Sequence, residues 1–154
     1  MDMDMDIENT LAPWLGKTMK MIDNHIQDIF FEKNISLTKN QFIVLKRLKG
    51  KNGLPQQELA FLTGRDKTSL TRLINTMEKK NLVARILSKS DRRINNIHLT
   101  KKGELLLEET LPIMKNFAIS LQENISDEEI AKTINTIKKV QENLKKSTKS
   151  CSNN

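Results

Sequence analysis

The sequence is poor in the residues that hold metals and form disulfides. It has one cysteine and two histidines among 154 residues, and Cys151 has no second cysteine with which to form an intrachain bond. His25 and His98 are far apart in the sequence, so no cysteine and histidine grouping has the spacing of zinc ligands. A disulfide scaffold is therefore excluded, and we expect no bound metal and a reducing compartment. Cys151 also lacks the electropositive surroundings that activate a thiol sensor.

Signatures of catalysis and of membrane insertion are also missing. The chain shows no Ser/His/Asp set, no paired carboxylates and no glycine-rich phosphate loop, so we expect no enzyme and no cofactor. No apolar run approaches the roughly 18 residues of a membrane span. The Met-Asp repeat of residues 1–6 has acids where a signal peptide has basic residues. We therefore expect a cytoplasmic protein without a membrane partner.

Positive charge is concentrated in the middle of the chain. The formal net charge is +7, and residues 38–103 contain sixteen lysines and arginines against four acids. The two flanks together carry an acidic excess. This distribution favours a polyanionic partner that contacts only the middle region, although a basic surface that only meets solvent explains the charge equally well.

The first half of the chain predicts helices. Apolar residues recur every three or four positions from Ile7 to about Glu32, which indicates a long amphipathic helix. Pro13 within it predicts either a kink or a helix start near Leu11. Thr38, followed by Gln41 three residues later, is typical of a capping box that opens a second helix. That helix should end between Gly50 and Gly53.

A helix-turn-helix is expected next. Residues 55–62 predict a short third helix, and Gly64 is a plausible left-handed stop after it. Asp66 can cap a fourth helix that runs to about Lys80, with its carboxylate accepting from the backbone of Thr68 or Ser69. Two helices joined by a short glycine-containing turn are the outline of a helix-turn-helix.

The pattern after residue 81 predicts a hairpin and two more helices. Residues 82–87 and 94–99 are strand-like, and the polar turn of residues 88–93 lies between them. Thr100 can cap a helix of residues 101–124, in which Pro112 should introduce a kink. Ser126 and Glu129 form another capping box before a last helix, whose apolar stripe consists of Ile130, Ile134, Ile137, Val140 and Leu144.

These elements predict a mainly α fold, a winged helix-turn-helix core with a two-stranded wing hairpin between N- and C-terminal dimerisation helices. We expect one structural domain. Its segments are a disordered segment (1–6), a dimerisation helix (7–37), the winged helix-turn-helix (38–103), two C-terminal dimerisation helices (104–146) and a disordered tail (147–154).

The fourth helix has two different faces. Its apolar side packs on the core, and the other side carries Thr68, Thr71, Arg72, Asn75 and Lys79. In the major groove, arginine pairs with guanine, asparagine pairs with adenine, and threonine contacts a phosphate or a thymine methyl. A solvated helix face is the alternative, but such a face usually includes glutamates, and here Glu78 comes only at the end.

The turn of the hairpin is the second basic feature. Residues 88–93 place three basic residues and one acid on a projecting loop, and an arginine there can enter a narrow minor groove. Asp91 can hold the Arg93 guanidinium extended through a charge-assisted bond. A solubilising turn is the alternative, but its place directly after a helix-turn-helix favours a wing.

These residues together resemble a known family. The stretch Asp91-x-Arg93, five residues, Leu99-Thr100, two residues, Gly103 is similar to the wing signature of MarR-family transcriptional regulators. Residues 66–73 and 77–85 resemble that family's recognition helix and first wing strand, with Asn81 where many members have glycine. The resemblance implies a homodimer whose first, fifth and sixth helices interlock, with Arg93 in the minor groove and Asp91 bracing the wing.

Two sets of DNA contacts and one pocket are expected. The recognition-helix contacts are Lys67, Thr68, Ser69, Thr71, Arg72 and Asn75. The wing contacts are Arg85, Lys89, Ser90, Asp91, Arg92 and Arg93. An effector pocket beneath the first helix is assigned to Trp14, Met21, His25 and Phe42, although methionines at helical spacing are more often core residues.

The terminal helices carry more apolar surface than a small winged core covers, which favours a dimer, although packing within one chain also explains the stripe on the last helix. We therefore expect a homodimeric, sequence-specific regulator, a repressor of a pseudo-palindromic double-stranded DNA operator that a small-molecule effector relieves. The alternatives are a winged helix that contacts an acidic protein partner and a constitutive DNA-binding protein without effector.

Overall fold

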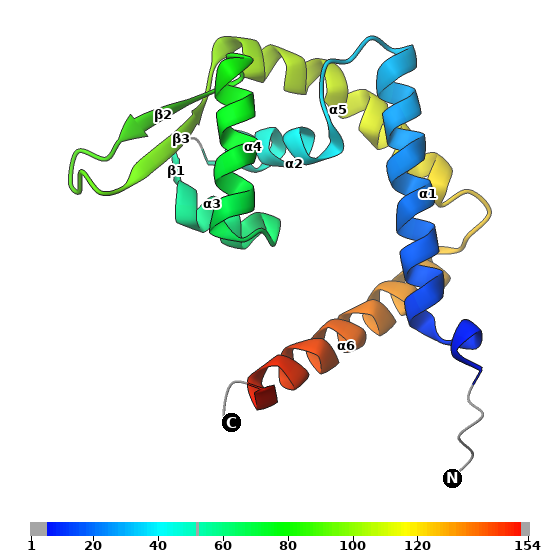
Figure 1. Ribbon diagram of the computed structural model, residues 1–154. Helices are drawn as coiled ribbons and strands as arrows, with labels where there is room; N and C mark the ends of the chain where they lie inside the picture. The colour runs from blue at the N-terminus through cyan, green and yellow to red at the C-terminus, as the bar shows by residue number, and fades with distance from the viewer. Residues whose placement is uncertain (1–5, 52, 152–154) are drawn as a thin grey trace. The chain divides into compact units, whose positions relative to one another are not determined.

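The computed structural model describes residues 6–51 and 53–151. Contacts within the chain divide it into two compact units, with the boundary in the sequence between Leu111 and Pro112. Each unit is described separately. The first unit contains η1 (Ile7–Asn9), α1 (Leu11–Glu32), α2 (Lys39–Gly50), β1 (Leu54–Pro55), α3 (Gln56–Thr63), α4 (Lys67–Lys79), β2 (Val83–Leu87), β3 (Asn95–Leu99) and the first part of α5 (Lys101–Leu121) (Figure 1). The second unit contains the end of α5 and α6 (Asp127–Cys151).

The helix starts follow the expected capping residues. Helix α1 begins at Leu11, so Pro13 lies in its first turn, where a proline costs no helical hydrogen bond. Thr38 accepts from the backbone N–H of Gln41 at 3.2 Å, and the Gln41 side chain accepts from the Thr38 N–H at 3.1 Å, which confirms the capping box of α2. The first helix therefore starts near Leu11, the second of the two expected possibilities.

The turn between α3 and α4 also has the expected residues. Gly64 ends α3 in the left-handed conformation, with φ of 64°, where a residue without Cβ is unstrained. Asp66 then accepts from the backbone N–H of Ser69 at 2.8 Å and caps α4. The helix-turn-helix is confirmed.

The wing has one strand more than expected. Strands β2 and β3 pair antiparallel from Val83↔Leu99 to Leu87↔Asn95, and β1 pairs with the other edge of β3 through Leu54↔Ile97. The expected hairpin of β2 and β3 is confirmed, and β1 adds a third strand to it. The sequence did not predict β1 because this strand is only two residues long and pairs with residues more than forty positions away. His98, on β3, is half-buried against Gly53.

An aliphatic core holds the helices and the sheet of the first unit together. It consists of side chains from the helices, from the sheet and from the segment between α4 and β2, and the fully buried ones include Leu45, Leu48, Leu54, Leu59, Leu70, Ile74, Met77, Leu82, Ile97 and Leu107. Burial of this kind contributes on the order of 1.5–3 kcal/mol for each large side chain. The core therefore fixes α4 and the wing on one scaffold.

Helix α5 begins against the segment that leads into β2. The Thr100 hydroxyl accepts from the backbone N–H of Gly103 at 3.0 Å and donates to the carbonyl of Asn81 at 2.6 Å. Gly103 is buried, and a Cβ built on it would lie 2.1 Å from the carbonyl oxygen of Leu82. Thr100 and Gly103, two residues of the wing signature, thus have a structural role, because they pack the start of α5 against the segment that leads into the wing.

The second unit is helical. Pro112 lies inside α5, which continues to Leu121. Ser126 accepts from the Glu129 N–H at 3.2 Å, and its own backbone N–H and hydroxyl both donate to the Glu129 carboxylate at 2.9 Å. These bonds stabilise the charged form and lower the pKa of Glu129. The capping box of the last helix is confirmed.

The chain ends differ from the expected disordered segments. Helix α6 extends to Cys151, so residues 147–151 are helical where a disordered tail was expected. The Ser147 and Thr148 hydroxyls donate to carbonyls one turn earlier, which allows polar residues to continue the helix. At the other end, the Asp6 side chain caps η1. The expectations for residues 1–5 and 152–154 lie outside the described residues.

Candidate nucleic-acid interface

Helix α4 places a polar face outward on the first unit. Leu70, Ile74 and Met77 are buried on its inner side, while Thr68 and Arg72 are exposed on the outer side. Among the described residues, the side chains of Lys67, Thr68 and Arg72 have no hydrogen-bond or ion-pair partner. These three expected contact residues are therefore free to meet a ligand.

Two other expected contact residues of α4 are already bonded within the protein. The Thr71 hydroxyl donates to the Lys67 carbonyl and accepts from Nε2 of Gln56, both at 2.8 Å. The Ser69 hydroxyl accepts from Nη1 of Arg65 at 2.7 Å. These side chains contribute first to the local structure of the helix-turn-helix.

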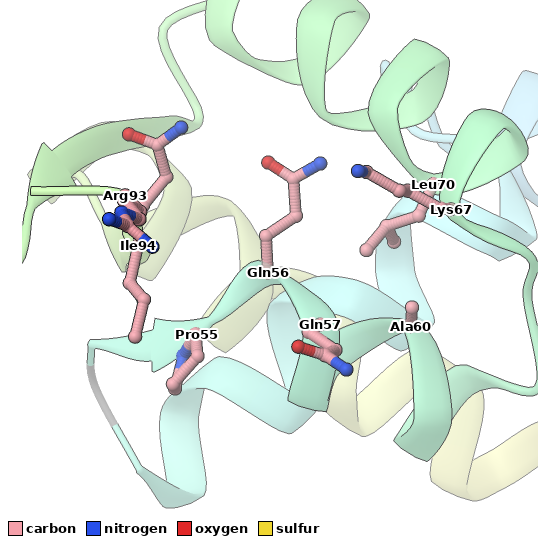
Figure 2. Close-up of a pocket in the computed structure, with 9 residues that line it drawn as sticks. Pro55, Gln56, Gln57, Ala60, Lys67, Leu70, Arg93 and Ile94 are labelled. Atoms are coloured by element: carbon pink, nitrogen blue, oxygen red, sulfur yellow. The ribbon is translucent and has the colours of Figure 1, made fainter. Parts of the chain in front are cut away.

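A groove of about 600 Å³ runs between α4, α3 and the loop end of the wing. Figure 2 shows the side chains of Arg93 and Lys67 at opposite ends of this groove, with Gln56 between them. Gln57 also lines it. The two cations and two amides offer hydrogen-bond donors to an anion, as a phosphate contact requires.

A second concavity, of about 470 Å³, lies on the other side of α4. It is lined by Asn40 from α2, by Arg65 from the turn before α4, and by Arg72 and Thr76 from α4 itself. Asn40, Arg65 and Thr76 were not expected at the site. These three side chains come together because α2 packs against the helix-turn-helix. The only indication in the sequence is the positive charge of Arg65 beside the Asp66 cap.

The wing loop is ordered by its own side chains. The Ser88 hydroxyl accepts from the backbone N–H groups of Ser90 and Asp91 at 3.3 and 3.4 Å. Asp91 accepts from the backbone N–H of Arg93 at 2.9 Å, not from its guanidinium, because an aspartate naturally closes a turn onto the second residue after it. Asp91 therefore shapes the loop, and the expected bond to the Arg93 guanidinium was wrong.

Three exposed cations remain on this loop. Lys89, Arg92 and Arg93 are exposed, and within the described parts of the chain none of their side chains forms an ion pair. Their charge is thus available to a polyanion.

Arg85 faces α4. Its cross-strand partner is the buried Ile97, so both side chains lie on the inner face of the sheet. Nη1 of Arg85 donates to Glu78 at 2.9 Å and Nη2 donates to Asn75 at 2.7 Å, and its side chain is 19% exposed. Instead of projecting with the wing loop, Arg85 connects the wing to the recognition helix.

A model of the MarR family matches residues 37–94. That segment covers α2, the helix-turn-helix, β2 and the wing loop, the elements that form the surface described above. Over this segment the chain is similar to the MarR family. The resemblance inferred from the recognition helix and the wing is confirmed, and with it the mainly α winged-helix fold.

Solved structures of MarR-type regulators have the same fold. S. aureus MepR in complex with DNA is 22% identical, with a TM-score of 0.80 over 88% of this chain and 99% of that chain. Bordetella bronchiseptica BpsR is 20% identical, with a TM-score of 0.80 over 88% and 95%. A mutant MarR from E. coli complexed with operator DNA is 25% identical, with a TM-score of 0.73 over 88% and 98%.

The four residues assigned to an effector pocket do not line either concavity beside α4. Trp14, Met21 and His25 lie on one face of α1, where they are exposed, while Phe42 is buried in α2. The two buried residues of α1 are Ile26 and Phe30, which shows that the opposite face packs on the core. In a single chain, the first three side chains face outward.

The described residues form neither a membrane-spanning helix nor a cluster of metal ligands. No described helix is long and apolar enough to cross a membrane. No group of three or more histidines, cysteines and acids there has the arrangement of metal ligands.

Proposed function

We propose that this protein is a homodimeric transcriptional regulator that binds double-stranded DNA in a sequence-specific manner and acts in the cytoplasm as a repressor. The observation that carries the proposal is the exposed face of α4, where Lys67, Thr68 and Arg72 have no partner among the described residues. Donor-lined concavities lie on both sides of this face. A helix in the major groove meets bases in front and phosphates on either side.

Apolar side chains on the terminal helices support the dimer. No described side chain of α6 is buried, yet Ile134 and Leu144 continue an apolar stripe, exposed by 47% and 63%. Trp14 is 60% exposed on α1. Surfaces of this kind usually pack against a partner, and a second copy of the chain offers the same stripes in a closed, twofold arrangement.

The dimer determines the spacing of the two recognition helices on DNA. Two recognition helices related by a twofold axis fit half-sites about one helical turn apart, near 10 bp, on a pseudo-palindromic operator. Arg93, exposed on each wing loop, reaches the neighbouring minor groove, where the negative potential favours arginine.

Release by a small molecule is the regulatory part of the proposal. A compound that binds between the dimer helices and the winged lobes changes the spacing of the two recognition helices, so its binding and DNA binding oppose each other through linkage. The exposed Trp14, Met21 and His25 face of α1 is the wall we assign to it. BpsR, which shares the fold, is a protein whose DNA binding is regulated by 6-hydroxynicotinic acid.

Selection of bound duplexes from random DNA tests the proposal. The wild type should select a pseudo-palindrome. Arg72→Ala should cost about 1–3 kcal/mol and relax the sequence preference at one position of each half-site, because a base contact is lost. Arg93→Ala should weaken binding to all sequences and reduce the salt dependence.

The matched control is Arg47→Ala, which removes the same charge from an exposed position of α2 outside the concavities and should leave the preference unchanged. Absence of any bound duplex in dilute buffer would contradict the proposal. An equal loss on every sequence for Arg72→Ala would contradict its role in base contact.

A further inference from the structure

The side chain of Asn75, on the outer face of α4, is oriented by a hydrogen bond from Arg85 of β2. Nη2 of Arg85 donates to Oδ1 of Asn75 at 2.7 Å. A guanidinium has donors and no acceptor, so the Asn75 amide must turn its oxygen, and not its nitrogen, toward Arg85. The NH₂ group of Asn75 is thereby directed away from Arg85, and Asn75 is exposed.

Arg85 cannot easily follow a rotation of this amide. Its guanidinium also donates to Oε1 of Glu78 at 2.9 Å and to Oε1 of Gln56 at 3.4 Å. The backbone N–H of Arg85 donates to the other Glu78 oxygen at 3.3 Å. Three elements, α3, α4 and β2, therefore hold the guanidinium in place while it faces the amide.

This arrangement limits what Asn75 offers to a base. Pairing with adenine through two hydrogen bonds requires the amide oxygen and nitrogen to align together with the edge of the base. Arg85 already occupies one of the two lone pairs of Oδ1, so the oxygen has one left for a base. The outward NH₂ group can donate to N7 or O6 of guanine, to N7 of adenine or to O4 of thymine, whereas cytosine presents only a donor.

We propose that Arg85 is a positioning residue that makes Asn75 a hydrogen-bond donor in the major groove, so that Asn75 favours guanine, which presents two acceptors, over cytosine, which presents only a donor. The inference rests on the proposed function and adds to it the chemistry of one base contact. It assigns the orientation of the amide, which the residue type alone does not determine.

The experiment compares duplexes selected from random DNA by the wild type and by variants. Asn75→Ala first identifies the operator position that Asn75 reads, as the position whose preference it relaxes. At that position the wild type should favour guanine over cytosine by roughly 5- to 100-fold. Asn75→Asp still accepts from Arg85 but has no donor, so the preference should turn toward cytosine.

Arg85→Met frees the amide and keeps an apolar stem in the same place. The freed amide can also turn its oxygen toward the amino group of cytosine, so the preference for guanine over cytosine should be lost, while the position read by Arg72 stays as it is. Glu78→Gln is the matched control, because it removes a charge beside Arg85 but keeps an oxygen that accepts from it; its selected sequences should equal those of the wild type.

Failure of the wild type to favour guanine over cytosine at the Asn75 position would overturn the proposal. So would a uniform loss of affinity for Arg85→Met without any change of preference, since that result indicates a structural role alone. Asn75→Asp is a change at an exposed position, so it tests the proposal even where Arg85→Met reduces the yield of folded protein. Failure to select any duplex overturns the proposed function as well, and is distinct from selection of duplexes without a preference for guanine over cytosine.

Discussion

Replacing Ile134 with aspartate is expected to lower the affinity for a duplex with two half-sites by about 10²- to 10⁴-fold. Ile134 lies in the apolar stripe of α6 and is 47% exposed, so the new charge does not disturb the core of a single chain. It does meet the second copy in the proposed dimer, where an unpaired charge is costly. A separated lobe loses the gain in effective concentration that linked binding provides.

Asn135→Asp is the matched control for this change. It adds the same charge to the next position of α6, outside the stripe, where Asn135 is exposed. Sedimentation should give a monomer for Ile134→Asp and a dimer for Asn135→Asp, and titration of a labelled duplex should give the affinities. A dimer with wild-type affinity for Ile134→Asp would place the interface elsewhere.

The second large effect is expected from alanine at position 103. A Cβ at Gly103 would lie 2.1 Å from the carbonyl oxygen of Leu82, and a backbone atom cannot move aside as a flexible side chain can. Helix α5 must then shift from the segment before β2, which should lower the free energy of unfolding by about 1–3 kcal/mol, the usual cost of overpacking a core. Urea denaturation measures this change as a lower midpoint.

Gly50→Ala is the control for the Gly103 variant. Gly50 is exposed at the end of α2, and a Cβ there would meet no atom within 4 Å. Its effect on the free energy of unfolding should stay within about 0.5 kcal/mol. If Gly103→Ala is as stable as Gly50→Ala, the close packing of α5 on the wing does not carry the stability assigned to it.

Local signals explain why most of the fold was predictable. The Thr38 and Ser126 capping boxes, the Gly64 stop and the Asp66 cap each involve residues within four positions of one another. Such bonds form wherever the chain is helical, so the sequence pattern alone predicts them. The strand β1 has no such pattern, since it contains a proline and is stabilised only by its distant pairing with β3.

The sequence predicted the orientation of site residues only where their side chains have no partner within the described parts of the protein. Arg72 and Arg93 have the exposure that the sequence implied. Arg85 differs, because its orientation follows from the register with Ile97 and from acceptors on two other elements. Arg65 and Asn40 come together only through tertiary packing. Residue type and helical spacing could not indicate either arrangement.

The spacing of half-sites tests the central claim most directly, namely that a dimer places two recognition helices in successive major grooves. The selected duplex is compared with one that has five base pairs inserted between the half-sites, which turns one half-site to the opposite face of the helix. The account predicts two chains on the original duplex and a loss of affinity of about 10²- to 10⁴-fold on the other. One chain per duplex, or equal affinity for both spacings, would contradict it.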